Sequence, residues 1–237
     1  RGNREAVHIF TKVNSGKKPG GLSAKAIHES VEASLNRLQT DYIDLYFSHW
    51  PDAETSHEET LAAYDPLVRS GRVRVIGASN YTAEMVREAQ QTAIIKSLPR
   101  YDVLQPRYNL YDRAEFEALR DVVVENEIGT VVYYSLASGF LTGKYRSAAD
   151  FNKSPRGGGA ENYLDAKGKA ILAALDSVSA ANDATPAEVS LAWLVAQKGV
   201  TAPIASATSV EQVRSLAKGV RLKLSDAELK VLTDAGK

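Results

Sequence analysis

Short apolar segments, rich in β-branched and aromatic residues, alternate along this sequence with amphipathic segments of helical period. The segment 42–48, YIDLYFS, is apolar on both faces, as parallel strands buried under helices are. In the preceding polar region, apolar residues recur every three to four positions, at Ile27, Val31, Leu35 and Leu38, which predicts a helix. Strands of this kind are expected at residues 6–13, 42–48, 73–79, 102–106, 130–135 and 201–206.

The helical segments lie between these strands, so the repeating unit is βα. Ser56 and Glu59 have the spacing of a capping box at the start of one helix. Helices are expected at residues 23–38, 56–71, 83–95, 113–126, 166–181, 186–197 and 210–217, and from the sequence LSDAE to the C-terminus. Repeated βα units fold either into an open doubly wound sheet or into a (β/α)₈ barrel.

Two observations favour the α/β class with a (β/α)₈ TIM barrel. No GxGxxG motif follows the first strand, which argues against a dinucleotide-binding open sheet. Polar side chains gather instead at the C-terminal ends of several strands, where TIM barrels carry their active sites. The long irregular stretch 146–163 is predicted to be a loop of the length that is usually either a lid or disordered. No linker divides the sequence, so a single domain is expected over residues 1–237.

Composition excludes several classes of function. Lysine plus arginine and aspartate plus glutamate number 29 each, so neither nucleic acid nor an anionic membrane is expected as a partner. The chain has no cysteine, which rules out disulfides and thiolate metal sites and fits the cytoplasm. No apolar run reaches the roughly 18 residues of a membrane span, and nothing predicts a metal.

Lys12 and His49 are the first candidates for chemistry. A lysine within a strand is costly unless it reaches water, pairs or takes part in catalysis, so Lys12 is either an edge-strand residue or a functional one. His49 begins the sequence HWPD at the end of the 42–48 strand, and Pro51 turns the chain away. A histidine there is either satisfied locally or presented to a pocket.

Three later segments add hydrogen-bonding and anion-binding groups. In GASNY, Ser79 and Asn80 can bind an amide, although Asn80 or Thr82 can equally cap the next helix. The segment 133–145, YYSLASGFLTGKY, combines a strand-closing aromatic residue with a glycine-bearing loop and Lys144, which suits a phosphate. The segment PIASATSVEQV brings serine and threonine to a helix N-terminus, which also suits an anion.

Taken in order along the chain, these motifs resemble the aldo-keto reductase family. The resemblance runs from TKV through RLQTDYIDLYFSHWPD, LVRSGRVRVIGASNY, VLQPRYNLYDR and YYSLASGFLTGKYR to IASATSVEQV. It implies a (β/α)₈ barrel that binds NADPH, or less often NADH, and transfers a hydride between the nicotinamide and a carbonyl compound or alcohol. Lys12 would lower the pKa of a catalytic tyrosine, and His49 would orient the substrate carbonyl.

The resemblance also assigns cofactor contacts. Ser79, Asn80 and Gln105 would bind the nicotinamide carboxamide, and Tyr133 would stack on the nicotinamide ring. The pyrophosphate would lie near Leu136, Ala137, Gly139 and Lys144, with Arg156 from the long loop above it, and the adenosine phosphate near Ser206, Thr208 and Gln212. The family often has Tyr-Ser-Pro-Leu at positions 133–136, where this chain has Tyr-Tyr-Ser-Leu. Arg214 is the nearest basic residue to the last group, so NADP is expected by family habit and NAD is possible.

The same resemblance places Lys12 on the third strand of the barrel. We therefore expect this chain to represent the portion from that strand onward, without the first two βα units and without the family's catalytic aspartate and tyrosine. Two alternatives to a reductase follow, a cofactor-binding subunit with little catalysis and an inactive fragment. Trp50, Tyr81 and Tyr108 are candidates to line a pocket for an apolar carbonyl, and each is equally compatible with ordinary packing. Neither the substrate nor the oligomeric state can be read from the sequence.

Overall fold

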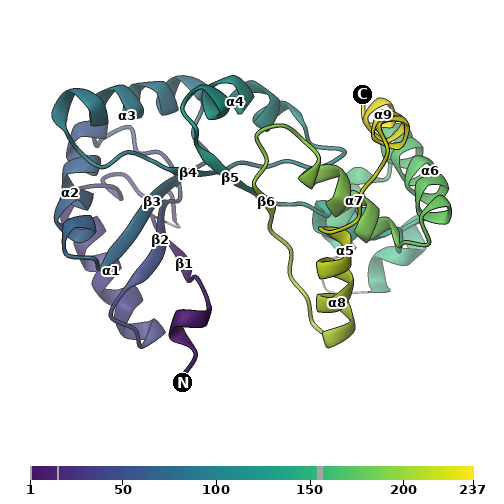
Figure 1. Ribbon diagram of the computed structural model, residues 1–237, viewed down its shortest axis with the longest axis horizontal. Coiled ribbons are helices and arrows are strands. Elements are labelled where there is room, and N and C mark those ends of the chain that lie inside the picture. Colours follow the sequence, from purple (N-terminus) through teal and green to yellow (C-terminus); the bar gives the residue numbers. More distant parts are fainter. Residues whose placement is uncertain (1, 15, 154–156) are drawn as a thin grey trace. The chain divides into compact units, whose positions relative to one another are not determined.

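The computed structural model describes residues 2–14, 16–153 and 157–237. Within them, six parallel strands pair in the order in which they occur in the sequence, which confirms the α/β class (Figure 1). The strands are β1 (Phe10–Val13), β2 (Ile43–Ser48), β3 (Val73–Ser79), β4 (Val103–Gln105), β5 (Gly129–Val132) and β6 (Ala202–Pro203). The closed eight-stranded barrel stays a prediction.

Helices connect the strands, as the alternating pattern predicted. The α-helices are α1 (Ala24–Leu38), α2 (His57–Arg69), α3 (Ala83–Lys96), α4 (Ala114–Glu125), α5 (Gly157–Ala160), α6 (Ala166–Ala181), α7 (Pro186–Val195), α8 (Val210–Gly219) and α9 (Asp226–Ala235). The 3₁₀ helices are η1 (Arg4–Ala6), η2 (Ala137–Thr142), η3 (Ala148–Lys153) and η4 (Glu161–Tyr163). None of the described helices is long and apolar enough to cross a membrane.

The chain divides into two compact units. The first comprises Arg1–Pro106 with Ala118–Thr130, and the second comprises Arg107–Glu117 with Val131–Lys237. The expectation of one domain over the whole chain stays a prediction.

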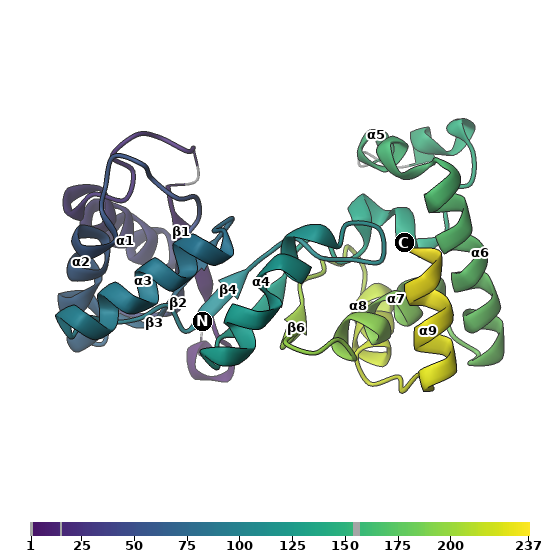
Figure 2. The same cartoon turned by 90° about the horizontal axis from the view of Figure 1, so that it is seen from above.

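In the first unit, α1, α2 and α3 lie along the strands β1 to β3 (Figures 1 and 2). All six residues of β2 are buried, in agreement with its apolar sequence on both faces. Ile27 and Val31 from α1, Tyr46 from β2 and Leu61 from α2 belong to one hydrophobic cluster. The amphipathic spacing on α1 therefore faces the sheet, as the pattern required.

The second unit has its own core. Trp193 on α7 is fully buried, and its Nε1 donates to Thr233 Oγ1 on α9 at 3.0 Å. The ring centroid of Tyr108 lies 5.3 Å from that of Trp193. Helices α6 and α9 lie side by side in both views (Figure 2). This core orders the segment 133–145, which carries the candidate phosphate-binding residues.

Helix starts follow the local sequence closely. A serine, threonine or aspartate caps α1, α2, α3, α6, α7, α8 and α9 by accepting a hydrogen bond from a backbone N–H of the first turn. At α2, only half of the predicted capping box is present: Ser56 Oγ accepts from Glu59 N at 3.2 Å. The Glu59 carboxylate instead accepts from Ala24 N, also at 3.2 Å, at the start of α1. Tertiary contact has redirected that side chain.

Three predicted strands differ from the structure by three residues or more at one end. The strand predicted at 6–13 begins only at Phe10: residues Arg4–Ala6 form η1, and the Ile9 N–H donates to the side chain of Asp44. The strand predicted at 130–135 ends at Val132, since Tyr134 adopts a left-handed conformation with φ of 58°. The strand predicted at 201–206 is reduced to two residues. The stretch 146–163, predicted to be irregular, contains the short turns η3, α5 and η4.

Candidate functional site

Lys12 lies on β1, His49 directly follows the neighbouring parallel strand β2, and the alternation of side chains places both on one face of the sheet. Lys12 on β1 pairs in register with Phe47 on β2, and its Nζ lies 5.5 Å from the Phe47 ring centroid. His49 follows Phe47 by two residues, and its backbone N–H donates to Val13 O at 3.1 Å, which continues the ladder past Ser48. Because side chains two apart on a strand point the same way, Lys12, Phe47 and His49 face the same side.

Both side chains have lowered pKa values, and the charge of Lys12 acts on His49. Burial lowers the pKa of Lys12. Burial, and then the positive charge of Lys12, lower the pKa of His49 from its ordinary value of 6.5. His49 is therefore mostly neutral at pH 7, where it can donate from one ring nitrogen and accept at the other. Its Nδ1 is buried, without a hydrogen-bond partner among the described residues.

The ends of β2, β3 and β4 are joined by a chain of polar side chains. Asn80 follows β3 in a left-handed conformation, with φ of 62°, and its Nδ2 donates to His49 O at 2.8 Å and to Ser79 Oγ at 3.2 Å. Ser79 Oγ in turn donates to Gln105 O at 2.8 Å. The structure thus brings together four residues that the sequence singled out separately: His49, Ser79, Asn80 and Gln105.

Behind β2 lies a set of buried hydroxyl groups, of which only Tyr81 was singled out from the sequence. Ser48 Oγ lies 3.0 Å from Tyr64 Oη and 2.9 Å from Tyr101 Oη, and Tyr81 Oη lies 3.5 Å from Tyr101 Oη. Ser48 immediately precedes His49, so its side chain points to the opposite face of the sheet. The hydroxyl group at the end of an otherwise apolar strand was the signal available in the sequence, but its tyrosine partners come from three other segments.

The loop candidates of the second unit follow β5. Tyr133 pairs with Arg107 through an isolated parallel bridge, and burial raises the pKa of Tyr133 to about 12, so its phenol stays protonated at neutral pH. Ala137, Ser138 and Gly139 follow in the 3₁₀ helix η2, all with positive φ, at 47°, 55° and 89°. Leu136 precedes them and accepts the Gly139 N–H at 2.8 Å.

Lys144 lies close to this turn. A methyl group at Gly139 would be 3.5 Å from Lys144 Cε and 3.7 Å from its Nζ. The side chain is exposed, and Nζ lies 4.9 Å from the Tyr145 ring centroid. A tight turn beside an exposed ammonium group can bind an anion.

The third group of candidates lies at the start of α8. Thr208 donates to Gln212 Oε1 from its backbone N–H at 2.7 Å, and Ser209 caps the helix by accepting from Gln212 N at 3.3 Å. Ser206 is exposed nearby, as is Arg214 on the helix. Arg156 lies outside the described residues.

The three pocket candidates differ in their surroundings. Trp50 is half-buried, and its ring is stacked beside the His49 ring, with centroids 5.5 Å apart. Tyr81 is buried among the hydroxyl groups described above, and Tyr108 is fully buried against Phe116 and Trp193. Of the three, only Trp50 adjoins a candidate catalytic residue.

Two surface cavities lie elsewhere. One, of about 740 Å³, lies between α2 and α3 and is lined by residues such as His57 and Lys96. The other, of about 630 Å³, is lined by residues of the second unit such as Arg107 and Arg113. Neither includes a predicted site residue, and the described residues contain no cluster of three or more histidine, cysteine or acidic side chains able to hold a metal.

Comparison with known proteins gives one consistent result. The aldo/keto reductase family matches residues 1–237. The NADP(+) aldo-keto reductase yakc of Schizosaccharomyces pombe is 32% identical over 247 residues, which cover 99% of this chain and 71% of yakc. The NADH-specific methylglyoxal reductase of Escherichia coli is 32% identical over 235 residues, covering 95% of this chain and 69% of that enzyme. A crystal structure of a thermostable aldo-keto reductase with the inhibitor epalrestat superposes with a TM-score of 0.78 at 32% identity, over 98% of this chain and 73% of that one.

Proposed function

The chain belongs to the aldo/keto reductase family, and from that premise we propose that it binds NADP(H) and serves hydride transfer between the nicotinamide and a carbonyl compound or the matching alcohol. The observation that carries the proposal is the shared face of Lys12 and His49 beside the bonded chain through Asn80, Ser79 and Gln105. We further propose that β1 to β6 correspond to the last six strands of an eight-stranded barrel, which the coverage of 73% of the crystal structure supports.

The first unit fits the nicotinamide carboxamide. That group has two N–H donors and one carbonyl acceptor, so it needs partners of both kinds. Ser79 supplies a hydroxyl group, and Asn80 and Gln105 supply amides. Because Asn80 is tied to His49 O, a carboxamide bound here would lie close to the histidine.

We propose that the second unit binds the nicotinamide ring and the phosphates of the cofactor. We assign ring stacking to Tyr133, pyrophosphate binding to the turn from Leu136 to Gly139 with Lys144, and the adenosine phosphate to Ser206, Thr208 and Gln212. Arg156 completes the proposed set. The exposed Arg214 is the nearest basic side chain for a 2′-phosphate. We propose NADP(H), with NAD(H) possible, because one relative is named for NADP(+) and another for NADH.

When bound, the nicotinamide supplies or accepts the hydride. Neutral His49 would hold the substrate carbonyl by donating a hydrogen bond from its imidazole, in line with its lowered pKa. Lys12 would provide positive charge that favours an ionised phenol and hence proton transfer near neutral pH. Trp50, stacked beside His49, would line the carbonyl side of the pocket.

No tyrosine of this chain is assigned as the catalytic phenol. Tyr46, Tyr101 and Tyr108 are all fully buried, and burial raises the pKa of Tyr46 and of Tyr101, which is opposite to the shift that catalysis needs. A cofactor-binding protein with little turnover is therefore the second candidate function, and it predicts binding without catalysis.

The test measures binding and turnover separately. Binding of NADP⁺ and NAD⁺ is measured by calorimetry on the chain as it stands, and turnover by the loss of NADPH absorbance with a panel of aldehydes that includes methylglyoxal. Lys12→Met should keep binding and abolish any turnover, whereas Lys169→Met, an exposed lysine on α6, should change neither. Binding without turnover would favour the second candidate, and the absence of both would reject the proposal.

A further inference from the structure

The strand that carries Lys12 is short, and within the described residues it pairs only with β2. Four residue pairs join β1 to β2, from Phe10 opposite Leu45 to Val13 opposite Ser48. Phe10 is 46% exposed, so hydrophobic burial at that end contributes little to holding the strand in place. Only Val13 of the four residues of β1 is buried, so the hydrophobic pattern of the strand alone specifies its register weakly.

Asp44 provides that contact at the start of β2. Its side chain is only 6% exposed, and Oδ2 accepts a hydrogen bond from Ile9 N, the residue before β1, at 2.8 Å. In the opposite direction, Ile9 O accepts from Asp44 N at 3.1 Å and from Leu45 N at 3.3 Å. Ile9 is thus bound by both the backbone and the side chain of the same residue, which permits one alignment of β1 along β2.

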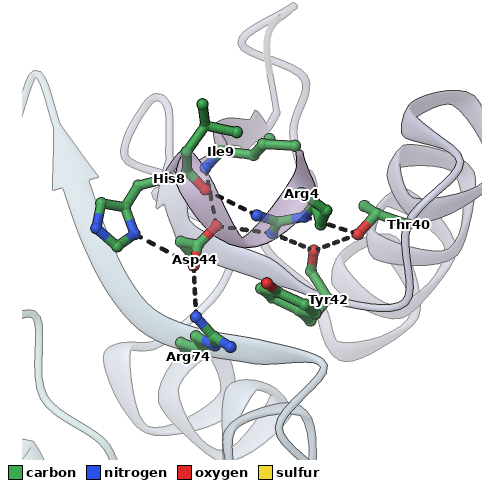
Figure 3. Close-up of polar contacts among 8 residues, drawn as sticks. Arg4, His8, Ile9, Thr40, Tyr42, Asp44 and Arg74 are labelled. Carbon is green, nitrogen blue, oxygen red and sulfur yellow. Dashed lines mark hydrogen bonds and ion pairs between the residues drawn. The ribbon is translucent and has the colours of Figure 1, made fainter. Parts of the chain in front are cut away.

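Two arginines hold the carboxylate in this position (Figure 3). Arg4 Nη2 donates to Asp44 Oδ2 at 2.7 Å, and Arg74 Nη1 donates to Oδ1 at 2.9 Å. The guanidinium carbons of Arg4 and Arg74 lie 3.8 Å and 3.9 Å from the Tyr42 ring centroid. His8 Nδ1 is 3.4 Å from Oδ1 on the exposed side. Arg4 is 22% exposed and Arg74 53%, so Arg4 is the better anchored of the two. Charge-assisted hydrogen bonds from such groups orient a carboxylate.

Arg4 also anchors the segment before the strand. It donates to Thr40 Oγ1 at 2.8 Å, to Val7 O at 2.9 Å and to Tyr42 O at 2.9 Å. These bonds connect η1, the turn into β2 and the approach to β1. Through Arg4, the Asp44 carboxylate is thus connected to η1 and to the segments that lead into β1 and β2.

The register decides the direction of Lys12. With Lys12 opposite Phe47, its ammonium group lies on the face that also carries His49. A slip of one residue would turn Lys12 to the other face and bring Thr11 in its place, because side chains alternate along a strand. Asp44 lies on the opposite face from Phe47 and near the other end of β2, so it acts on Lys12 only through the strand alignment.

We propose that Asp44 is a positioning residue for the site: by binding the Ile9 N–H, with Arg4 and Arg74 holding its carboxylate, it sets the register of β1 and so directs Lys12 to the face of His49. The consequence for catalysis rests on the proposed function, but the consequence for Lys12 does not. Loss of the Ile9 bond should release Lys12 from its half-buried position, and turnover, where present, should fall about 100-fold, as a shift of about 1 Å in a reacting group does.

The test compares three variants by a readout that needs neither cofactor nor substrate. Lysines are methylated reductively with ¹³C-formaldehyde, and the pKa of Lys12, assigned by its absence in Lys12→Met, is followed by NMR. Asp44→Ala removes the acceptor for Ile9, Asp44→Asn keeps an acceptor oxygen but removes the charge, and Asp65→Ala removes an ordinary helix-surface partner of Arg69. Hydrogen exchange of the Ile9 amide is measured in parallel.

We expect Lys12 to keep its lowered pKa in Asp44→Asn and Asp65→Ala, and to titrate as an ordinary lysine in folded Asp44→Ala, whose Ile9 amide should exchange faster. A folded Asp44→Ala variant with an unchanged Lys12 pKa would overturn the proposal. If Asp44→Ala does not fold, the test rests on Asp44→Asn. A folded Asp44→Asn variant in which the Ile9 amide is protected but Lys12 has the pKa of an ordinary lysine would also overturn the proposal. If the protein binds no NADP(H) but Lys12 titrates as expected in all three variants, the proposed function is rejected and the role of Asp44 is supported.

Discussion

Replacing Gly77 with alanine tests how tightly the strands beneath the site are packed. Gly77 lies in the middle of β3, between Phe47 on β2 and Val103 on β4. A Cβ atom at this position would lie 2.6 Å from Phe47 Cε1 and 2.6 Å from Val103 O. Carbon contacts are ordinarily 3.5 to 4.0 Å, so about 1 Å of movement is required on both sides.

The expected cost follows from these distances. Overpacking a well-packed interior costs about 1 to 3 kcal/mol, since strands hydrogen-bonded on both sides cannot move apart freely. Alanine offsets part of this, by about 0.4 to 1 kcal/mol, because it restricts the unfolded chain more than glycine does. The free energy of unfolding should therefore fall by about 1 to 2 kcal/mol, and Tm by about 2 to 8 °C for a chain of this size.

Urea unfolding followed by circular dichroism measures this difference. The matched control is Gly158→Ala on α5, where an added Cβ meets no atom within 4 Å. The control should be unchanged or slightly more stable, because only the unfolded chain is affected. If Gly77→Ala were as stable as the control, the packing argument would be refuted, and Phe47 would not be a fixed partner for Lys12.

Three further predictions concern charge and helix capping. Burial alone would raise the pKa of Asp44, but the bonds from Ile9, Arg4 and His8 hold this pKa at about 2, below the ordinary 3.8. The ionised carboxylate therefore stabilises the fold above pH 3.8, and this stabilisation is lost as the pH falls through 2. The shift corresponds to about 2.5 kcal/mol, or about 1 to 2 kcal/mol after solvent screening, so the urea midpoint should fall between pH 5 and pH 2 by less in Asp44→Asn than in the unaltered chain. Lys12→Met should raise the pKa of His49 while burial keeps it below 6.5, and an NMR titration in which it stayed the same would contradict the coupling. Thr185→Ala breaks the reciprocal capping box with Glu188 at the start of α7 and should cost about 1 kcal/mol in urea unfolding, and an unchanged midpoint would show that the cap is dispensable.

Much of the fold could be predicted because its causes are local. The apolar run at 42–48 and the 3–4 spacing on α1 each reflect burial of one short segment, and both elements formed as expected. The prediction at 166–181 coincides with α6, and its N-cap at Asp165 lies within the same few residues. Local sequence failed where partners from elsewhere intervene: Arg4 in η1 and the Ile9 N–H both bind the Asp44 carboxylate, and β1 starts four residues later than the predicted strand.

The candidate site, too, could be predicted in part from the sequence. The order of motifs along the chain was sufficient to single out Lys12, His49, Ser79, Asn80 and Gln105, because each follows or ends an apolar strand. Their roles stay predictions. Nothing in the order of motifs indicated that Ser79 and Asn80 would join His49 to Gln105, since those bonds depend on how far each strand extends.

The sequence by itself determined the element types and several helix caps, since these depend on patterns contained within single segments. The order of the motifs along the chain determined the family. Only the tertiary structure decided the alignment of β1 on β2, the hydroxyl groups around Ser48 and the arginine pair around Asp44. The physical reason is that register and buried polar contacts join residues some 30 to 50 positions apart in the sequence. Periodicity predicts which residues of a strand are buried, but the partner strand determines which residue each one faces.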